Sequence, residues 1–242
     1  MIETGSLIRS LSGRHAARNF HTFVINEIGR GIVTGRFPIG SVLASDAVMM
    51  EQYGVSRTVL REALKTLESK GLVEARPKVG TRVSPRSRWN FFDPQLLAWH
   101  FDAPPDPAFN ESLFRVRELM EIPMVKLAAQ HRTAEQVRLM KYWAHKMETA
   151  DDSIEQFGLA CLEVHSVIAE AAQDLLLRSV TGVVELTLAL ALTRNSELTG
   201  SQYRRQSATL FTRLVSAIEL RMPDDAAGIL AECCALDRKQ LA

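Results

Sequence analysis

Apolar residues near the start of the chain recur every three or four positions, which is the spacing of an amphipathic helix. The apolar stripe between residues 18 and 34 consists of Phe20, Val24, Ile28 and Ile32. A turn rich in glycine and proline follows, and Ser45 then has a residue type that helix N-caps prefer. We therefore expect one helix over 18–34 and a shorter second helix that ends near residue 52.

A further N-cap candidate, Ser56, precedes a strongly periodic segment that ends near Lys70, just before Gly71. The buried stripe of this third helix is expected to contain Leu60, Ala63, Leu64 and Leu67. Two short β-like runs follow at 72–75 and 81–84, and the turn residues between them predict a hairpin. A helix, a helix-turn-helix and a hairpin in this order are typical of a winged helix-turn-helix domain.

The second half of the chain has a helical pattern almost throughout. We expect helices near 108–131, 133–149, 153–172, 174–199, 201–221 and 223–240. Their N-cap candidates are Thr133, Ser153, Asp174 and Ser201. Before them, Asp93 and Pro94 have the pattern of a cap and first-turn proline of a short helix. The predicted fold class is mainly α, with an N-terminal winged helix-turn-helix and a C-terminal antiparallel all-α helical bundle.

The predicted winged helix-turn-helix half and the predicted helical half of the chain also differ in charge. Residues 1–88 carry 14 Lys and Arg against 7 Asp and Glu, whereas the rest carries 15 against 21. This asymmetry suggests that the first part meets a polyanion. The three cysteines, of which two are adjacent, do not form a disulfide framework, and no apolar run is long enough to span a bilayer. We therefore expect a reduced, cytoplasmic protein that does not enter a membrane.

The third predicted helix carries basic residues on a face that is not its buried stripe. Arg57, Arg61 and Lys65 recur every four residues there. A recognition helix fits the DNA major groove, and its first residues reach base edges and phosphates. A solvated surface is the alternative, but the cap, the turn and the hairpin all favour DNA binding. The predicted DNA-binding residues are Ser56, Arg57, Thr58, Arg61, Lys65 and, in the hairpin, Lys78 and Arg82.

Residues 35–83, above all "VSRTVLREALKTLESKGLVE" and the ending "GTRV", resemble the DNA-binding domain of GntR-type bacterial transcription regulators. The resemblance places the family's phosphate and base contacts at Ser56, Arg57, Thr58 and Arg61. Two positions depart from the family pattern. Ala47 stands where many members have a basic residue, and Lys78 stands where they have a wing glycine.

The helical half resembles the FCD effector domain of the FadR branch of that family. Its opening helix matches "LFRVRELMEIPMVKLAAQHRT" at 113–133, and its central helix matches "ACLEVHSVIAEAAQDLLL". The segment 84–99 also resembles the linker of a branch member that responds to a sugar acid. The resemblance implies a dimer on a near-palindromic double-stranded DNA operator, most often a repressor, with a small carboxylate or sugar acid as its effector.

The same resemblance raises the question of a metal. Many FCD domains hold a divalent ion with an Asp and a His one turn apart and with two later His. This chain keeps His165, but Cys161 replaces the Asp and no histidine follows His165. We therefore expect no cofactor and a broken metal site. A zinc site made of Cys161, His165 and Cys234 is the alternative, as is a role for the cysteines as small buried residues.

Without a metal, an acidic effector needs another counter-charge. Arg117 on the opening FCD helix can bind a carboxylate in a bidentate manner, although an ion pair with Glu121, four residues on, is the structural alternative. Arg213 and Arg194 are weaker candidates. The predicted effector-binding residues are Arg117, Cys161, His165 and Arg213.

These patterns predict four parts of the chain. They are a flexible arm at 1–17, a DNA-binding domain at 18–85, a linker with a short helix at 86–107 and a helical effector-binding and dimerisation domain at 108–242. Catalysis is not expected, because no phosphate-binding glycine loop or nucleophile elbow occurs, although Cys161 and His165 share a helix face. A constitutive DNA-binding protein without an effector is the other alternative.

Overall fold

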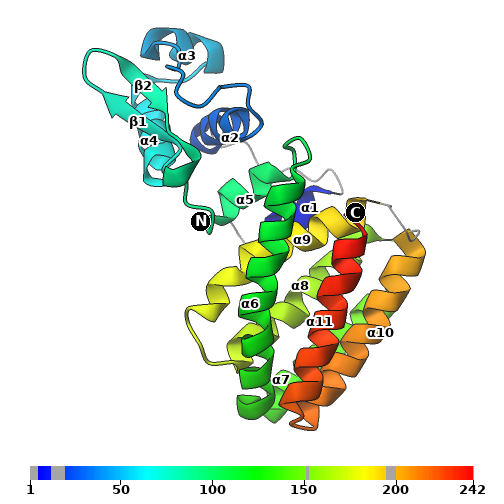
Figure 1. Ribbon diagram of the computed structural model, residues 1–242. Coiled ribbons are helices and arrows are strands. Elements are labelled where there is room, and N and C mark those ends of the chain that lie inside the picture. The colour runs from blue at the N-terminus through cyan, green and yellow to red at the C-terminus, as the bar shows by residue number, and fades with distance from the viewer. Residues whose placement is uncertain (1–4, 12–19, 151–152, 195–199, 242) are drawn as a thin grey trace. The chain divides into compact units, whose positions relative to one another are not determined.

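The computed structural model describes residues 5–11, 20–150, 153–194 and 200–241. Its elements form two compact units, shown as ribbons in Figure 1. One unit contains α2 to α5 and a hairpin, and the other contains α1 and the long helices α6 to α11. The predicted fold class is confirmed. Within the described ranges, no helix combines the length and the apolar character that crossing a bilayer requires.

The first unit has the element order of a winged helix-turn-helix. Its elements are α2 (Phe20–Val33), α3 (Asp46–Tyr53), α4 (Arg57–Ser69), β1 (Val73–Arg76) and β2 (Gly80–Val83). The predicted N-caps are present, because the Ser45 side chain accepts from Val48 N and the Ser56 side chain accepts from Val59 N. The strands pair antiparallel, with Val73 opposite Val83, so the hairpin forms the wing.

Helix α5 (Pro94–His100) belongs to this unit although it lies in the segment predicted as a linker. Asp93 caps it as expected, and its apolar face packs on α2. One polar side chain of α2 fixes the contact: Asn26 Oδ1 accepts from Gln95 Nε2 at 2.9 Å and from Trp99 Nε1 at 3.2 Å. The short 3₁₀ helix η1 (Arg86–Arg88) precedes it.

The second unit is a bundle of long helices. They are α6 (Pro107–His131), α7 (Ala134–Glu148), α8 (Ile154–Ala171), α9 (Thr181–Thr193), α10 (Gly200–Glu219) and α11 (Pro223–Lys239). Helix α7 packs along α8, α11 packs along α6, and α10 lies against both α7 and α11. Helix α9 is apolar on nearly all sides and is buried among the others. The predicted caps Thr133 and Ser153 both begin helices.

The prediction of one helix over 174–199 is wrong in its first part. Asp174 Oδ1 accepts from the backbone N–H groups of Leu176 and Leu177, so it stabilises a turn rather than a long helix. The 3₁₀ helix η2 (Leu177–Val180) follows, and α9 begins only at Thr181. Residues 195–199 of the predicted helix lie outside the described residues. Ser201 does not cap α10, which begins one residue earlier.

Part of the predicted N-terminal arm is folded. Residues 1–4 and 12–17 lie outside the described residues, but α1 (Ser6–Ser10) packs on α8 and α9. Leu7 and Ile8 are buried in that contact, with 8% and 0% of their surface exposed. This short helix is therefore part of the bundle, in contrast to the loose arm expected there.

Two glycines of the winged-helix unit allow a matched test of its packing. Gly54 and Gly71 both have a left-handed backbone, with φ of 64° and 78°. A Cβ at Gly54 would meet nothing within 4 Å, whereas a Cβ at Gly71 would lie 1.9 Å from the Arg88 carbonyl oxygen. Only the Gly71 substitution must therefore push two backbone segments apart.

We expect Gly54→Ala to lower the free energy of unfolding by about 1 kcal/mol, the cost of a left-handed alanine. Gly71→Ala should lower it by roughly 3 kcal/mol or more, because overpacking adds to that strain. Urea denaturation followed by circular dichroism measures both values. Equal losses at the two positions would contradict a tight contact between Gly71 and Arg88.

Candidate functional sites

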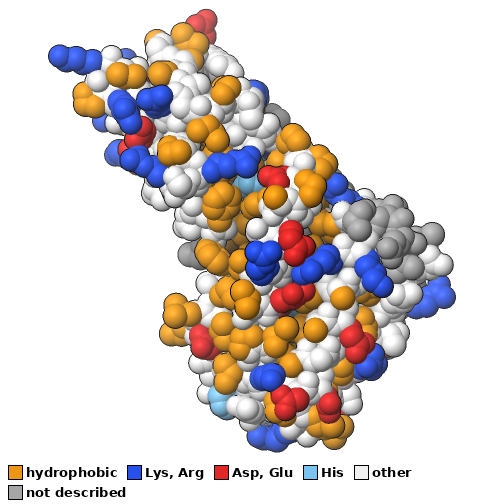
Figure 2. Space-filling view, in the orientation of Figure 1, with side chains coloured by type: hydrophobic (Ala, Val, Ile, Leu, Met, Phe, Trp, Pro, Cys, Tyr) orange, Lys and Arg blue, Asp and Glu red, His pale blue; other side chains and the backbone are white. Residues whose placement is uncertain are grey.

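The outer face of α4 presents the predicted DNA-binding residues to solvent. Ser56, Arg57, Thr58, Arg61 and Lys65 are all exposed. Leu60, Ala63 and Leu67 on the opposite face are buried, so the helix is held by one side and free on the other. Figure 2 shows Lys and Arg side chains spread over the surface of this unit.

Most basic residues of the winged-helix unit already have an acidic partner. Lys65 pairs with Glu62, Lys70 pairs with Asp93, and Arg76 and Arg88 both pair with Glu74. Among the described residues, Arg57, Arg61 and Lys78 have no such ion pair. These three side chains therefore leave their positive charge available to an external anion.

The wing carries two of the predicted DNA-binding residues, which differ in their exposure to solvent and in their hydrogen bonds. Lys78 lies in the turn of the hairpin, is exposed and has a left-handed backbone with φ of 61°, a conformation that favours glycine. Arg82 is partly buried, and its Nε donates to the Gly40 carbonyl at 2.7 Å. Arg82 thus holds the wing to the turn before α3, and Lys78 is the freer of the two.

The interior of the bundle contains a cluster of charged and polar side chains centred on Arg117. Only 1% of its surface is exposed. Its Nε donates to Glu121 Oε2 at 2.6 Å, and its Nη1 donates to Asp237 Oδ2 at 2.5 Å and Thr187 Oγ1 at 3.0 Å. Tyr203 OH donates to the other oxygen of Asp237 at 2.7 Å. The cluster thus joins α6, α9, α10 and α11, and we call it the Arg117 cluster.

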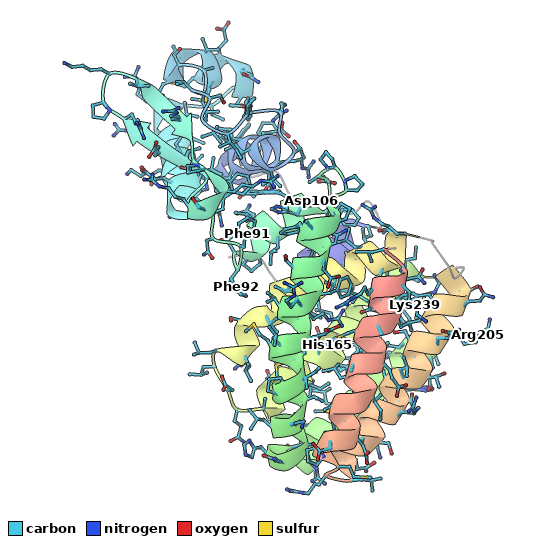
Figure 3. The ribbon with its side chains drawn as sticks, in the orientation of Figure 1. Phe91, Phe92, Asp106, His165, Arg205 and Lys239 are labelled. Carbon is cyan, nitrogen blue, oxygen red and sulfur yellow. The ribbon has the colours of Figure 1, made fainter. Side chains whose placement is uncertain are left out.

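His165 brings α8 into the Arg117 cluster and lies inside the bundle in Figure 3. Its Nδ1 is 2.6 Å from Glu121 Oε1, and its ring packs edge-on against Phe211. Its Nε2 is buried and has no hydrogen-bond partner among the described residues. A buried polar atom without a partner is unfavourable, so this nitrogen is a natural contact for a water or a ligand.

The electrostatics of the Arg117 cluster favour an ionised Glu121. Burial alone would raise the pKa of this carboxyl, but the His165 ring and the Arg117 guanidinium outweigh it and lower the pKa to about 2. Arg117 therefore faces two acidic side chains, Glu121 and Asp237, and is neutralised within the protein. The ion pair between Arg117 and Glu121, the structural alternative to an effector contact, is present.

Cys161 and Cys234 are free, buried thiols. Burial raises the pKa of Cys161 well above its ordinary value and that of Cys234 to about 12, so both thiols stay protonated at neutral pH. Within the part of the chain that the structure describes, no group of three His, Cys, Asp or Glu has the arrangement of a metal site. Cys161, His165 and Cys234, all among the described residues, are thus not grouped as the alternative zinc site would require.

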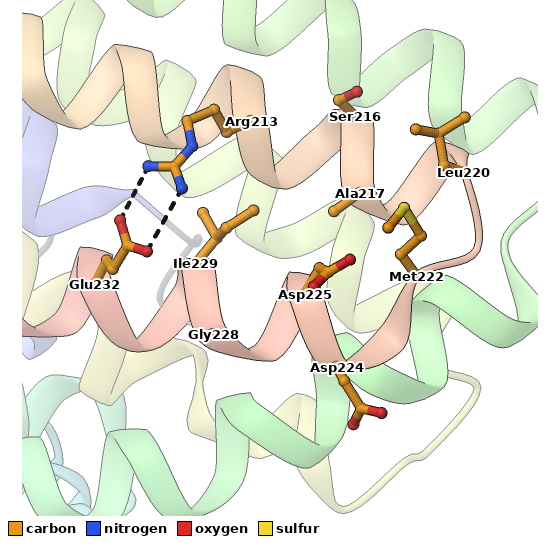
Figure 4. A pocket seen from close by; sticks show the side chains of 10 residues that line it. All are labelled: Arg213, Ser216, Ala217, Leu220, Met222, Asp224, Asp225, Gly228, Ile229 and Glu232. Carbon is orange, nitrogen blue, oxygen red and sulfur yellow. Dashed lines mark hydrogen bonds and ion pairs between the residues drawn. The ribbon is translucent and has the colours of Figure 1, made fainter.

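Arg213, predicted as an effector-binding residue, lies apart from the Arg117 cluster. It is half exposed on α10 and forms two contacts with Glu232 of α11, at 2.9 and 3.5 Å. Figure 4 shows this pair at one end of a surface groove between α10 and α11. The structure therefore brings together Arg117, Cys161 and His165 but not Arg213. Arg194 lies at the C-terminal end of α9.

Three members of the Arg117 cluster were not predicted: Thr187, Tyr203 and Asp237. Asp237 follows Cys234 by three residues and so shares a face of α11 with it, which is a weak signal. Thr187 and Tyr203 come from α9 and α10, and their distance from Arg117 in the sequence leaves no local pattern. Only packing of the helices reveals them.

A winged helix-turn-helix with a free basic face, joined to a separate helical domain, defines a class of DNA-binding regulators. The model of bacterial regulatory proteins of the gntR family matches residues 21–83, and the FCD domain model matches residues 112–235, just over half of the chain. The chain therefore belongs to the GntR family of bacterial regulatory proteins and carries an FCD domain.

Several Escherichia coli K12 and Salmonella proteins are similar in sequence. The uncharacterized HTH-type transcriptional regulator YieP of E. coli is 38% identical over 50% of this chain and 53% of its own, so the match spans about half its length. The E. coli galactonate operon transcriptional repressor is 26% identical over 65% and 69%. The transcriptional repressor NanR of Salmonella newport is 31% identical over 68% and 64%.

Two solved structures have the same fold. The structure of Lar, which controls expression of the Listeria monocytogenes agr system, has a TM-score of 0.65 at 14% identity and covers 93% of this chain and 98% of its own. E. coli McbR/YncC has a TM-score of 0.54 at 17% identity, with the same coverage. At these identities the likeness shows the fold alone. The family and the named relatives are transcriptional regulators, not enzymes.

The lowered pKa of Glu121 predicts how stability depends on pH. A carboxyl whose pKa is depressed on folding stabilises the folded state above its unfolded pKa near 4.5, and this stabilisation is lost as the pH falls towards 2. We expect a loss of up to about 3 kcal/mol over this window from Glu121 alone. Urea denaturation at intervals from pH 5 to pH 2 measures it.

Substitution of Glu121 shows how much of the pH dependence of stability comes from this residue. Glu121→Gln is less stable at neutral pH, because Arg117 loses a charged partner, but its stability should depend less on pH between 5 and 3. Glu232→Gln is the matched control, because Glu232 lies on the surface of the same unit. A Glu121→Gln slope equal to that of the wild type would contradict the depressed pKa.

Proposed function

We propose that the protein is a ligand-responsive transcription regulator, most simply a repressor, that acts in the cytoplasm as a homodimer on a near-palindromic operator. The observation that carries the DNA-binding half is the set of exposed cations on α4 and the wing that lack an acidic partner among the described residues. The names of two relatives, the galactonate operon transcriptional repressor and the transcriptional repressor NanR, support repression rather than activation.

Helix α4 is proposed to enter the major groove. Arg57 and Arg61 occupy its first two turns, where side chains of a recognition helix reach guanine edges and phosphates. Ser56 and Thr58 lie at its N-terminus, where backbone N–H groups attract a phosphate. Lys78 at the turn of the wing would contact the neighbouring backbone, and Lys65 would do so after leaving Glu62.

The effector is proposed to bind at the Arg117 cluster. An acidic effector faces a guanidinium that Glu121 and Asp237 already neutralise, so it can bind Arg117 only by taking the place of one of them. Asp237 is the more replaceable, because its other oxygen is held by a neutral tyrosine, Tyr203, whereas Glu121 also contacts His165. The unpaired His165 Nε2 supplies a further hydrogen-bonding group.

This exchange would couple the effector to the fold. The contact between Arg117 and Asp237 joins α6 to α11, and α6 is the helix that follows the DNA-binding unit in the chain. An effector carboxylate in place of Asp237 would change how these helices pack. Two states with different operator affinities are the physical requirement for regulation by a ligand.

A constitutive DNA-binding protein without an effector is the second candidate. The pairing of Arg117 with two carboxylates inside the protein favours it, because a guanidinium whose charge is already compensated does not require a ligand. The unpaired nitrogen of His165 favours an effector instead. A screen for ligands that stabilise the protein distinguishes the two.

Substitution of Arg57 tests the DNA-binding face. On a duplex selected from a random library by the full-length protein, we expect Arg57→Ala to weaken binding by about 1–3 kcal/mol and to relax sequence preference, since a base or bidentate phosphate contact is lost. Fluorescence anisotropy measures the affinities. Arg88→Ala removes the same charge from a residue that pairs with Glu74, and it should change affinity less. An unchanged affinity and preference in Arg57→Ala would contradict the role of α4.

Thermal-shift measurements test the effector. A ligand present at 100 times its dissociation constant stabilises the folded state by about 2.7 kcal/mol, which should raise Tm by roughly 5 °C or more. We expect this shift from one or more sugar acids or small carboxylates, and not from the matched neutral polyols or amines. The shift should weaken in His165→Gln and persist in Arg213→Ala. A shift from amines alone, or from no compound in a broad panel, would contradict an acidic effector.

A further inference from the structure

The short helix α1 packs on a surface formed by α8 and α9. This surface includes Gly158 and Glu185 and is called the seat of α1. Helix α1 belongs to the bundle by its contacts, although the whole DNA-binding unit follows it in the chain. Ile8 is fully buried and Leu7 nearly so. A terminal helix of five residues has little stability of its own, so these contacts hold it in place.

A buried carboxylate of α9 faces this helix. Glu185 is 6% exposed, and its Oε1 accepts from Leu7 N at 2.8 Å and from Ile8 N at 3.3 Å. Ionised carboxylates are seldom buried without such donors, because losing water is costly for a charge. The backbone N–H groups of α1 therefore satisfy a group of the bundle that would otherwise lack partners in the interior.

The apolar part of the seat also fits α1 closely. A Cβ added to Gly158 of α8 would lie 2.8 Å from Ile8 Cγ2 and 3.0 Å from Leu192 Cδ1, so only glycine leaves room for the Ile8 side chain. Gly5, at the start of α1, has φ of 85°, and a Cβ there would lie 2.9 Å from Leu159. Both sides of the contact thus have glycines where side chains would collide.

The seat shares two helices with the Arg117 cluster. On α8, Gly158 precedes His165 by two turns. On α9, Glu185 is two residues before Thr187, which binds Arg117. A movement of α8 or α9 at the cluster would therefore reach the seat through rigid helices.

We propose that this seat is a peptide-binding site whose occupant is the chain's own N-terminal segment, so that α1 tethers the DNA-binding unit from its N-terminal side. The unit is already followed by α6, and a docked α1 gives it a second attachment to the bundle. Two attachments restrict its orientations more than one does, which favours simultaneous binding of two half-sites by a dimer. This inference rests on the proposed operator binding.

Hydrogen–deuterium exchange of the full-length protein tests the docking. Gly158→Ala fills the seat, and we expect the Leu7 and Ile8 amides to exchange at least about tenfold faster than in the wild type. Gly228→Ala is the matched control, because a Cβ there meets nothing within 4 Å, and exchange should not change. Glu185→Ala should also speed exchange, and Glu185→Gln, which keeps an accepting oxygen, should lie closer to the wild type. Unchanged exchange in both Gly158→Ala and Glu185→Ala would refute the seat.

Anisotropy with two duplexes tests the tether, one duplex with both half-sites and one with a single half-site. We expect Gly158→Ala and Ile8→Ala to weaken binding of the two-half-site duplex about tenfold and to leave single-half-site binding unchanged, because only paired binding depends on restricted orientation. Ile8→Ala leaves the bundle helices untouched, so it decides the matter if Gly158→Ala is too unstable.

Faster exchange of α1 with no change in either affinity would overturn the tether. Equal weakening on both duplexes would overturn it as well, since a general loss of folded protein produces that result. Wild-type protein that binds neither duplex would instead contradict the proposed DNA binding, and the exchange data would still support or refute the seat.

Discussion

A guanidinium inside a helical bundle needs partners for its charge and its N–H groups, and this requirement shapes the FCD domain. Arg117 on α6 has Glu121 on its own helix and Asp237 and Thr187 from two others. Removing one partner would leave a buried charge uncompensated, which is more costly than the pair is favourable. Arg117 therefore links α6, α9 and α11 in the interior of the bundle.

In the winged-helix unit, by contrast, two arginines are exposed to solvent and have no ion-pair partner among the described residues. Arg57 and Arg61 are exposed on a helix whose other face is buried in the core, and neither forms an ion pair with a carboxylate among the described residues. An exposed cation costs little to leave unpaired, so its charge remains for a long-range attraction to a polyanion. The two sets of arginines thus differ in their surroundings: those on α4 are exposed, and Arg117 is buried and paired inside the bundle.

Local signals in the sequence predicted much of the fold, and non-local contacts account for what they missed. Caps such as Ser56 and Thr133 act on the next turn of their own helix, so residue type and spacing suffice to find them. Helix α1 has no such signal, because the contacts of Leu7 and Ile8 come from Gly158 and Glu185, which are far away in the sequence. In the same way, the pair of Arg117 with Glu121 was predictable at a spacing of four residues, whereas Asp237 was not.

Arg213 shows why residue type alone is insufficient for finding a ligand site. It has the same guanidinium as Arg117 and lies in the same domain, but its helix presents it to solvent and Glu232 is its partner. A carboxylate that replaced Glu232 there would exchange one solvated ion pair for another, with little gain. At Arg117 the same exchange would occur out of water and would alter the contact between α6 and α11. Burial, rather than charge, is therefore what would allow a ligand at this cluster to change the packing of the bundle.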